Sequence, residues 1–268
     1  MNRLVDYKTY TNNLKKSQVY YNFLVPLFDY LEKNNLQFEL LTKEQFAQYF
    51  SDKKYSSNSI NNVLKASRDY CKFIKLEQHP CFEIKMLEVE QRERIYITYD
   101  ELLNGIKHYA TYSNRGMTAD KASVILKFCF FTSIRKSELF TLTREKIDLI
   151  NSSALVWGAK DKTERTVYFP DTFTKELVDY FNSEKEELNA FNVTAPEFRW
   201  LVIKIGKYIN KKISPHTLRH SGAKYMVKKN ISPIAMQRIM GHDSLTTTLI
   251  YCKIDDKQAQ EIYKKQIG

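Results

Sequence analysis

The stretch GHDSLTTTLIY, residues 241–251, joins a Gly-His pair to three consecutive threonines and a tyrosine. Gly241 is placed to end a helix, because glycine readily takes the left-handed conformation that follows a last helical turn. Ser244 is placed to cap a short segment that ends at Tyr251. A tyrosine at helical spacing is most often a core residue, so the rest of the chain must decide whether Tyr251 is a core residue or a nucleophile.

A second polar cluster, SPHTLRH, lies at residues 214–220, one predicted helix earlier. His216 and Arg219 share a face near the N-terminus of that helix, where free N–H groups favour an anion. Such a pair is more often a solvated helix surface than a phosphate site. The spacing of His216 and His220 would suit zinc, but Thr217 stands where the zinc-protease motif needs its glutamate.

Composition favours a polyanionic partner. The chain has 268 residues, with 42 Lys and Arg against 31 Asp and Glu, which gives a net charge of +11. Divided after residue 87, the first part holds 13 basic and 9 acidic residues and the second holds 29 and 22, so both parts are basic. Two basic globular parts can close around a duplex, so we expect double-stranded DNA as the partner, with binding that weakens in salt.

The cysteines and the apolar runs indicate a reducing, intracellular setting. Cys71, Cys81, Cys129 and Cys252 form no CxxC pair and have no zinc-like spacing, so we expect no metal knuckle, disulfide framework or cofactor. The start of the chain lacks the apolar core of a signal peptide, and the longest apolar run is too short to span a bilayer. We therefore expect a soluble cytoplasmic protein, associated with the nucleoid and without membrane contact.

Helical periodicity dominates the chain, in which seven glycines and six prolines leave few breaks. The pattern predicts a helical domain over residues 1–86, a charged linker over 87–95, and a second domain with a C-terminal tail helix over 96–268. The one departure is ALVWGAKDKTERTVYF, residues 154–169, which predicts a β-hairpin with a basic tip. We therefore expect a mainly α protein with a small β-hairpin.

HTLRH followed by GHDSLTTTLIY closely resembles the C-terminal signature of the tyrosine recombinases, the integrase and Xer group. In that family His-x-x-Arg precedes a Leu-Gly-His turn and a Thr-Thr-x-x-Tyr nucleophile. The family also has an arginine in a Gly-Leu-Arg-x-Ser-Glu-Leu stretch, for which TSIRKSEL supplies Arg135. It has a lysine in the turn of a β-hairpin, for which GAKDKTERTVYFP offers Lys160, with Lys162 as the alternative. The four blocks stand in the family's order over about residues 96–258.

The sequence departs from the family pattern at three points. Ser133-Ile134 replaces the usual Gly-Leu before the arginine, and Met240 replaces the usual Leu before Gly-His. The hairpin ends in Tyr-Phe-Pro instead of Val-Pro-Leu. None of these changes removes a chemical group, but they indicate a differently shaped loop around Lys160.

The resemblance implies that Tyr251 attacks a DNA phosphate and forms a 3′-phosphotyrosine intermediate with a free 5′ hydroxyl. Arg135 and Arg219 suit the extra negative charge of the attacked phosphate, since guanidinium groups are permanently charged and can donate two bonds at once. His242 would donate a further hydrogen bond, and His216 would take the phenol proton.

Lys160 is the expected general acid for the departing 5′ oxygen, and Lys162 and Arg165 are expected to contact DNA. Because a phosphotyrosine ester conserves the energy of the broken bond, the resemblance implies an enzyme that needs neither a metal ion nor ATP. Glu138 is expected to be a buried partner that orients basic residues.

The resemblance further implies a two-domain DNA clamp that acts as a tetramer on paired sites, in which the tail after Tyr251 docks on a neighbouring protomer. Packing of the tail on its own domain remains an equal alternative. Integration, excision and chromosome resolution all remain open as the role, and so does the target sequence. Two other functions remain open: DNA relaxation of the type IB topoisomerase kind, and DNA binding without catalysis.

Overall fold

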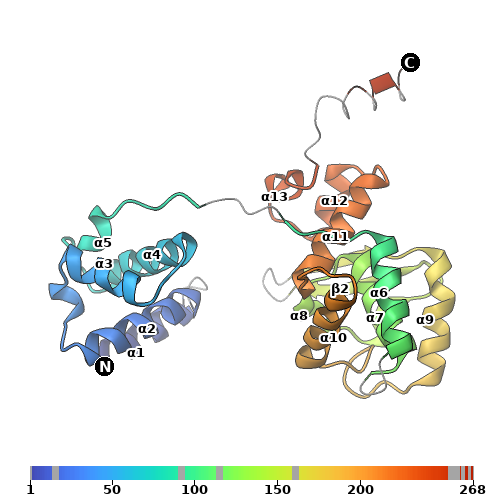
Figure 1. The fold of residues 1–268 in the computed structure, drawn as a ribbon, viewed down its shortest axis with the longest axis horizontal. Coiled ribbons are helices and arrows are strands. Elements are labelled where there is room, and N and C mark those ends of the chain that lie inside the picture. The colour runs from blue at the N-terminus through green and yellow to red at the C-terminus, as the bar shows by residue number, and fades with distance from the viewer. Residues whose placement is uncertain are drawn as a thin grey trace. The chain divides into compact units, whose positions relative to one another are not determined.

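The computed structural model describes residues 2–13, 18–89, 94–112, 117–158, 163–252 and four single tail residues, 260, 263, 264 and 267. The chain divides into two compact units, Met1–Arg92 and Glu93–Gly268. Figure 1 shows each unit as a cluster of helices, with a small sheet in the second. The mainly helical fold with a small sheet, expected from the sequence, is confirmed.

The first unit packs its helices around an aromatic core. Its elements are α1 (Asn2–Asn13), α2 (Gln18–Lys33), the 3-10 turn η1 (Phe38–Leu40), α3 (Lys43–Asp52), α4 (Ser57–Phe73) and α5 (Pro80–Glu83). Tyr70 of α4 lies in this core and meets the rings of Tyr7, Phe28 and Phe38 edge-on at centroid distances of 5.1, 5.2 and 5.1 Å. Edge-to-face contacts add to the stability that burial of the rings provides.

The second unit is built around α7, of whose 14 residues eight are buried. Its elements are α6 (Tyr99–Tyr112), α7 (Ala119–Thr132), α8 (Lys136–Leu139), η2 (Arg144–Lys146), β1 (Ile147–Asp148), β2 (Ser153–Gly158), β3 (Thr163–Tyr168), α9 (Asp171–Ser183), α10 (Ala195–Tyr208), α11 (Pro215–Lys228), α12 (Pro233–Met240) and α13 (Leu245–Leu249). Helices α6, α9 and α11 pack against α7. A helix that is apolar nearly all round must be covered in this way.

Strands β2 and β3 form the predicted hairpin, and β1 extends it to an antiparallel sheet in the order β1-β2-β3. Ala154 pairs with Val167 and Val156 pairs with Arg165. The side chains of Ala154, Val156 and Val167 are buried in the core of the second unit, as the period of two along a strand predicts. The tip of the hairpin, residues 159–162, lies outside the described residues.

Local sequence signals set several helix starts. Thr42 and Gln45 form a capping box at α3, and Thr98 and Glu101 exchange the same two hydrogen bonds before α6. No helix in the described ranges is both long and apolar enough to cross a membrane. Most of the predicted tail helix after Cys252 lies outside the description.

Candidate active site

The site begins at the sharp turn between α7 and α8. Ser133 makes this turn in the left-handed conformation, with φ of 49°. A non-glycine residue holds that conformation at an energetic cost, which explains why glycine is usual at this position of the signature. The turn places Arg135 at the start of α8, where its side chain lies beside Glu138.

Glu138 is a fully buried carboxylate that two arginines neutralise. Arg165 donates from Nη1 and Nη2 to the two carboxylate oxygens at 2.5 and 2.7 Å. Arg135 donates from Nη1 at 3.0 Å and from its backbone N–H at 2.7 Å. Burial acts to raise the pKa of Glu138, but the hydrogen bonds from Arg165 and Arg135 outweigh it and hold the pKa below its usual value. The expectation that Glu138 is a buried partner of basic residues is confirmed.

Three consecutive carbonyl groups at the end of α12 each accept a hydrogen bond from a different arginine. The bonds run from Arg165 Nε to the Ile239 carbonyl at 2.8 Å, from Arg219 Nη2 to the Met240 carbonyl at 2.7 Å, and from Arg135 Nη2 to the Gly241 carbonyl at 2.5 Å. The last carbonyls of a helix lack partners within it and carry its partial negative charge. The helix end thereby gathers three positive charges at one place.

Arg219 links the turn between α7 and α8 to the end of α12. It is only 5% exposed, and its Nη1 donates to the Ser133 carbonyl at 2.6 Å while Nη2 binds the end of α12. Burial, followed by the charges of Arg135 and Arg165, lowers the pKa of Arg219 to about 10, which leaves it charged at neutral pH. Because each guanidinium has five N–H donors, donors remain for the oxygens of a phosphate.

Tyr251 follows α13, and its hydroxyl is hydrogen-bonded to His220 Nδ1. The residue is 2% exposed. Burial raises the pKa of Tyr251 above its ordinary value, against the lowering effect of the charges of Arg219 and Arg94. Burial also lowers the pKa of His220 to about 4, aided by His216 and nearby arginines, so its ring is neutral near pH 7 and can accept the phenol proton.

Two further histidines flank this pair. The ring of His216 lies 4.3 Å from that of His220, and burial together with Arg219 and Arg94 lowers its pKa. The ring of His242 stacks on Tyr251 with centroids 6.3 Å apart, and its Nδ1 is 2.8 Å from Thr248 Oγ1. Burial lowers the pKa of His242 to about 4, followed by the effect of the arginines.

A basic cleft opens beside these residues. It has a volume of about 940 Å³, and His216 and Arg219 line one part of it. Its lining also includes five cations, Lys136, Arg199, Lys207, Lys211 and Lys212. No Asp or Glu is among the described residues that line it. A cleft of one charge sign attracts the phosphates of a nucleic acid.

Five of the six residues expected to carry the chemistry lie together: Arg135, His216, Arg219, His242 and Tyr251. The sixth, Lys160, lies outside the described residues, and so does Lys162. The side chain of Arg165 is 10% exposed, and its guanidinium is held by Glu138 and by the Ile239 carbonyl at the end of α12. Contact of Arg165 with DNA stays a prediction.

Three neighbours of Tyr251 were not predicted from the sequence. The Tyr251 hydroxyl is hydrogen-bonded to His220, for which the sequence indicated no catalytic role. The Arg94 guanidinium lies 5.9 Å from the centre of the Tyr251 ring, and Lys224 Nζ donates to the Tyr251 carbonyl at 2.9 Å. Lys224 lies four residues after His220 on α11, so helical periodicity alone could have placed both on one face. No local signal pointed to Arg94.

The model of the phage integrase family matches residues 87–258, which is more than half of the chain and includes every residue of this site. The chain belongs to the phage integrase family. Similar curated proteins are tyrosine recombinases. Tyrosine recombinase XerA of Pyrococcus horikoshii is 27% identical over 221 residues, which cover 79% of this integrase and 74% of XerA. Tyrosine recombinase XerD of Staphylococcus haemolyticus is 25% identical over 276 residues, which cover 96% and 90%. The integrase is therefore a tyrosine recombinase.

Solved structures share the fold of this integrase. The XerH site-specific recombinase bound to difH substrate before cleavage matches with a TM-score of 0.69 and 19% identity, over 93% of this chain and 79% of that one. The Tn1549 transposon integrase in complex with transposon right end DNA matches with a TM-score of 0.69 and 17% identity, over 99% of both chains. The likeness extends over both units of the integrase.

Proposed function

We propose that this integrase is a site-specific DNA recombinase that cuts and rejoins DNA strands through a covalent 3′-phosphotyrosine link to Tyr251. The observation that carries the proposal is the contact of the Tyr251 hydroxyl with the His220 imidazole, near the buried Arg219 that is held at the end of α12. A buried tyrosine of the core usually finds one hydrogen-bond partner, but it does not need arginines beside it as well. A nucleophile with a raised pKa needs both an acceptor for its proton and nearby cations.

The arginines hold the attacked phosphate. Arg135 and Arg219 are fixed at adjacent carbonyls, so their remaining N–H donors point from a rigid support. Donors that are held in place before the reaction stabilise the negative charge that grows in the pentavalent state. Glu138 and Arg165 take no part in the chemistry and act by keeping Arg135 in position.

Proton transfer completes the step. The Tyr251 oxygen forms a bond to phosphorus, its proton passes to the His216–His220 pair, and the bond from phosphorus to the 5′ oxygen breaks. Lys160 donates a proton to that departing oxygen. Religation reverses the step on another strand.

The proposal also covers the partner of the integrase, its need for metal or ATP, its assembly and the roles of its domains. Double-stranded DNA is the partner, which the basic cleft and the net charge of +11 favour. Cleavage needs neither a metal ion nor ATP, because the phosphotyrosine ester keeps the bond energy. The integrase acts as a tetramer on paired sites, with tails exchanged between protomers, on nucleoid DNA in the cytoplasm. Residues 1–86 form a core-binding domain, and Lys162 contacts DNA near the cut.

Covalent capture tests the proposal without knowledge of the target. A pool of duplexes with randomised arms and a nick near the middle is incubated with the integrase, in chelator and without ATP. Cleavage near the nick releases a short fragment and leaves the protein attached to DNA. We expect wild type and Tyr168→Phe, a change at an exposed tyrosine at the end of β3, to yield adducts from which the site can be sequenced. Tyr251→Phe should yield none.

Equal capture by wild type and Tyr251→Phe would refute the assignment of Tyr251 as the nucleophile. Relaxation of plasmid DNA without strand exchange between sites would refute recombination.

A further inference from the structure

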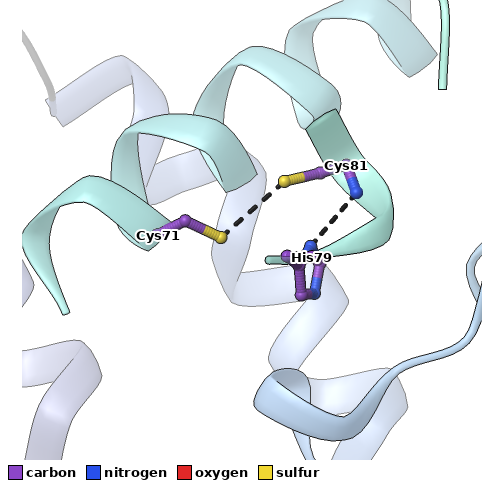
Figure 2. A group of neighbouring side chains, drawn as sticks. All are labelled: Cys71, His79 and Cys81. Atoms are coloured by element: carbon purple, nitrogen blue, oxygen red, sulfur yellow. Dashed lines mark hydrogen bonds between the residues drawn. The ribbon is translucent and has the colours of Figure 1, made fainter. Parts of the chain in front are cut away.

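The first unit holds a buried cluster of three metal-ligating side chains, in a different unit from the site described above. Cys71 lies in α4, His79 is the N-cap of α5, and Cys81 lies in α5, as Figure 2 shows. The two cysteines are fully buried and His79 is 4% exposed. Seven residues separate Cys71 from His79 and one separates His79 from Cys81, so the spacing resembles no zinc knuckle. The three side chains come together through tertiary packing and not through a local sequence motif.

The two sulfurs already have the separation that a metal ion requires. Cys71 Sγ lies 3.7 Å from Cys81 Sγ. Two thiolates bound to Zn²⁺ at about 2.3 Å in tetrahedral geometry lie about 3.8 Å apart. The ligand atoms of all three residues lie within 4.8 Å of one another. A tetrahedral site has a nitrogen to sulfur separation of about 3.6 Å, so the His79 ring has to approach by about 1.2 Å at most.

His79 is oriented as ligating histidines are. Its Nε2 is 2.9 Å from the Phe38 carbonyl, and its Nδ1 accepts a hydrogen bond from the Cys81 backbone N–H at 3.1 Å. The carbonyl fixes the proton on Nε2, which leaves the lone pair on Nδ1. A main-chain carbonyl at the second ring nitrogen is the usual support of a metal-bound histidine. A metal ion at Nδ1 would replace the hydrogen bond from Cys81.

We propose that Cys71, His79 and Cys81 bind a thiophilic metal ion such as Zn²⁺, with a non-protein ligand in the fourth position. Two thiolates neutralise the charge of a divalent ion, which allows it to be buried, and sulfur ligands favour Zn²⁺ over Mg²⁺ or Ca²⁺. The ion joins α4 to α5 and, through His79, to the turn that holds Phe38. Its role is structural, and it stands independently of the proposed recombinase activity.

Cobalt substitution tests the site in the full-length protein. Reduced, metal-depleted integrase is titrated with Co²⁺, whose thiolate charge-transfer and d–d absorption bands report tetrahedral sulfur coordination, and then with Zn²⁺ as competitor. We expect one equivalent of Co²⁺ to bind and Zn²⁺ to displace it. Zn²⁺ should protect two of the four cysteines from alkylation and raise the thermal unfolding midpoint, since it binds only the folded state. Mass spectrometry should identify the protected residues as Cys71 and Cys81.

Single substitutions distinguish metal binding at Cys71, His79 and Cys81 from binding at the other cysteines. Cys71→Ala should abolish the Co²⁺ bands and His79→Gln should weaken binding at least tenfold, whereas Cys252→Ala, the matched control, should bind as wild type does. Folding of each variant is followed by its helical circular dichroism. If Cys71→Ala does not fold, the identity of the protected cysteines in wild type decides. Absent Co²⁺ bands in folded reduced wild type, or protection of Cys129 or Cys252 instead, would overturn the proposal. A Cys71–Cys81 disulfide in protein that binds no Co²⁺ once reduced would overturn it too.

Discussion

A single arginine carries much of the geometry of the site. Arg219→Lys keeps a positive charge, but an ammonium group lacks the planar fork that reaches the Ser133 and Met240 carbonyls at once. We expect the initial rate of covalent adduct formation to fall by about 10² to 10³. Arg199→Lys is the matched control, since Arg199 is an exposed residue of the same cleft, and it should lower the rate only a few-fold. Equal losses in the two variants would mean that charge in the cleft matters and the fork does not.

The buried histidines predict how stability depends on pH. Folding lowers the pKa of His220 and of His242 from 6.5 to about 4, so the unfolded chain binds more protons between these values. The stability that they contribute is therefore present above pH 6.5 and is lost as pH falls toward 4. Urea unfolding at pH 7, 6, 5 and 4 should show this loss, and His242→Gln should show a smaller loss over the same range. If the free energy of unfolding of His242→Gln fell with pH as steeply as that of wild type, the lowered pKa of His242 would be contradicted.

The residues that sequence reasoning placed correctly are those with a local signature. A serine N-cap followed by proline indicates a helix start at Ser214-Pro215 and at Ser232-Pro233, and Gly241 indicates a helix end. The structure has all three. The contact of His220 with the Tyr251 hydroxyl could not be predicted in this way, because it depends on how α11 and α13 pack. For the same reason the ion pair of Arg165 with Glu138, 27 residues earlier in the chain, could not be predicted.

At the scale of elements, the turn from α7 to α8 stores strain. Ser133 holds φ of 49°, and its buried hydroxyl finds no partner among the described atoms. Ser133→Gly removes both defects, so we expect the free energy of unfolding to rise by about 1 kcal/mol, after allowance for the greater freedom of glycine in the unfolded chain. Urea denaturation at neutral pH measures the change. Destabilisation by Ser133→Gly would show that the serine supports the turn.

At the end of α12 we expect the opposite effect, a substitution that lowers the free energy of unfolding. Gly241 has φ of 61°, and a Cβ atom there would lie 2.7 Å from Arg165 Cδ. Gly241→Ala should lower the free energy of unfolding by about 1 to 2 kcal/mol, because it adds backbone strain and displaces Arg165. Gly241→Asn separates the two causes, since asparagine tolerates the left-handed conformation but still carries a Cβ. Wild-type stability in both variants would contradict the close approach of the two segments.

At the scale of the whole molecule, composition and periodicity were enough to predict a mainly helical chain with one hairpin. They could not predict the cluster of Cys71, His79 and Cys81, because it joins α4 to α5 through tertiary packing. The boundary between the two units was expected within residues 87–95, and the chain divides between residues 92 and 93. Charged, weakly periodic sequence marks such a boundary only to within several residues.

The net charge of +11 gives a prediction for the whole molecule. If lysines and arginines of both units contact phosphates, the logarithm of the DNA association constant should fall linearly with the logarithm of salt concentration. With about six contacts or more, affinity should drop by about 10³ between 50 and 200 mM salt. Fluorescence anisotropy with a labelled duplex measures the affinity at each salt concentration. A nearly flat salt dependence would contradict binding through the phosphate backbone.

The central claim is that Tyr251 becomes bonded to the 3′ phosphate of a cut DNA strand. Captured adducts are digested with protease and nuclease, and the peptide that keeps a nucleotide is sequenced by mass spectrometry. The account predicts one modified residue, Tyr251, linked through a 3′ phosphate, with a free 5′ hydroxyl on the released fragment. A nucleotide on any other residue, or a 5′ phosphate link, would contradict it.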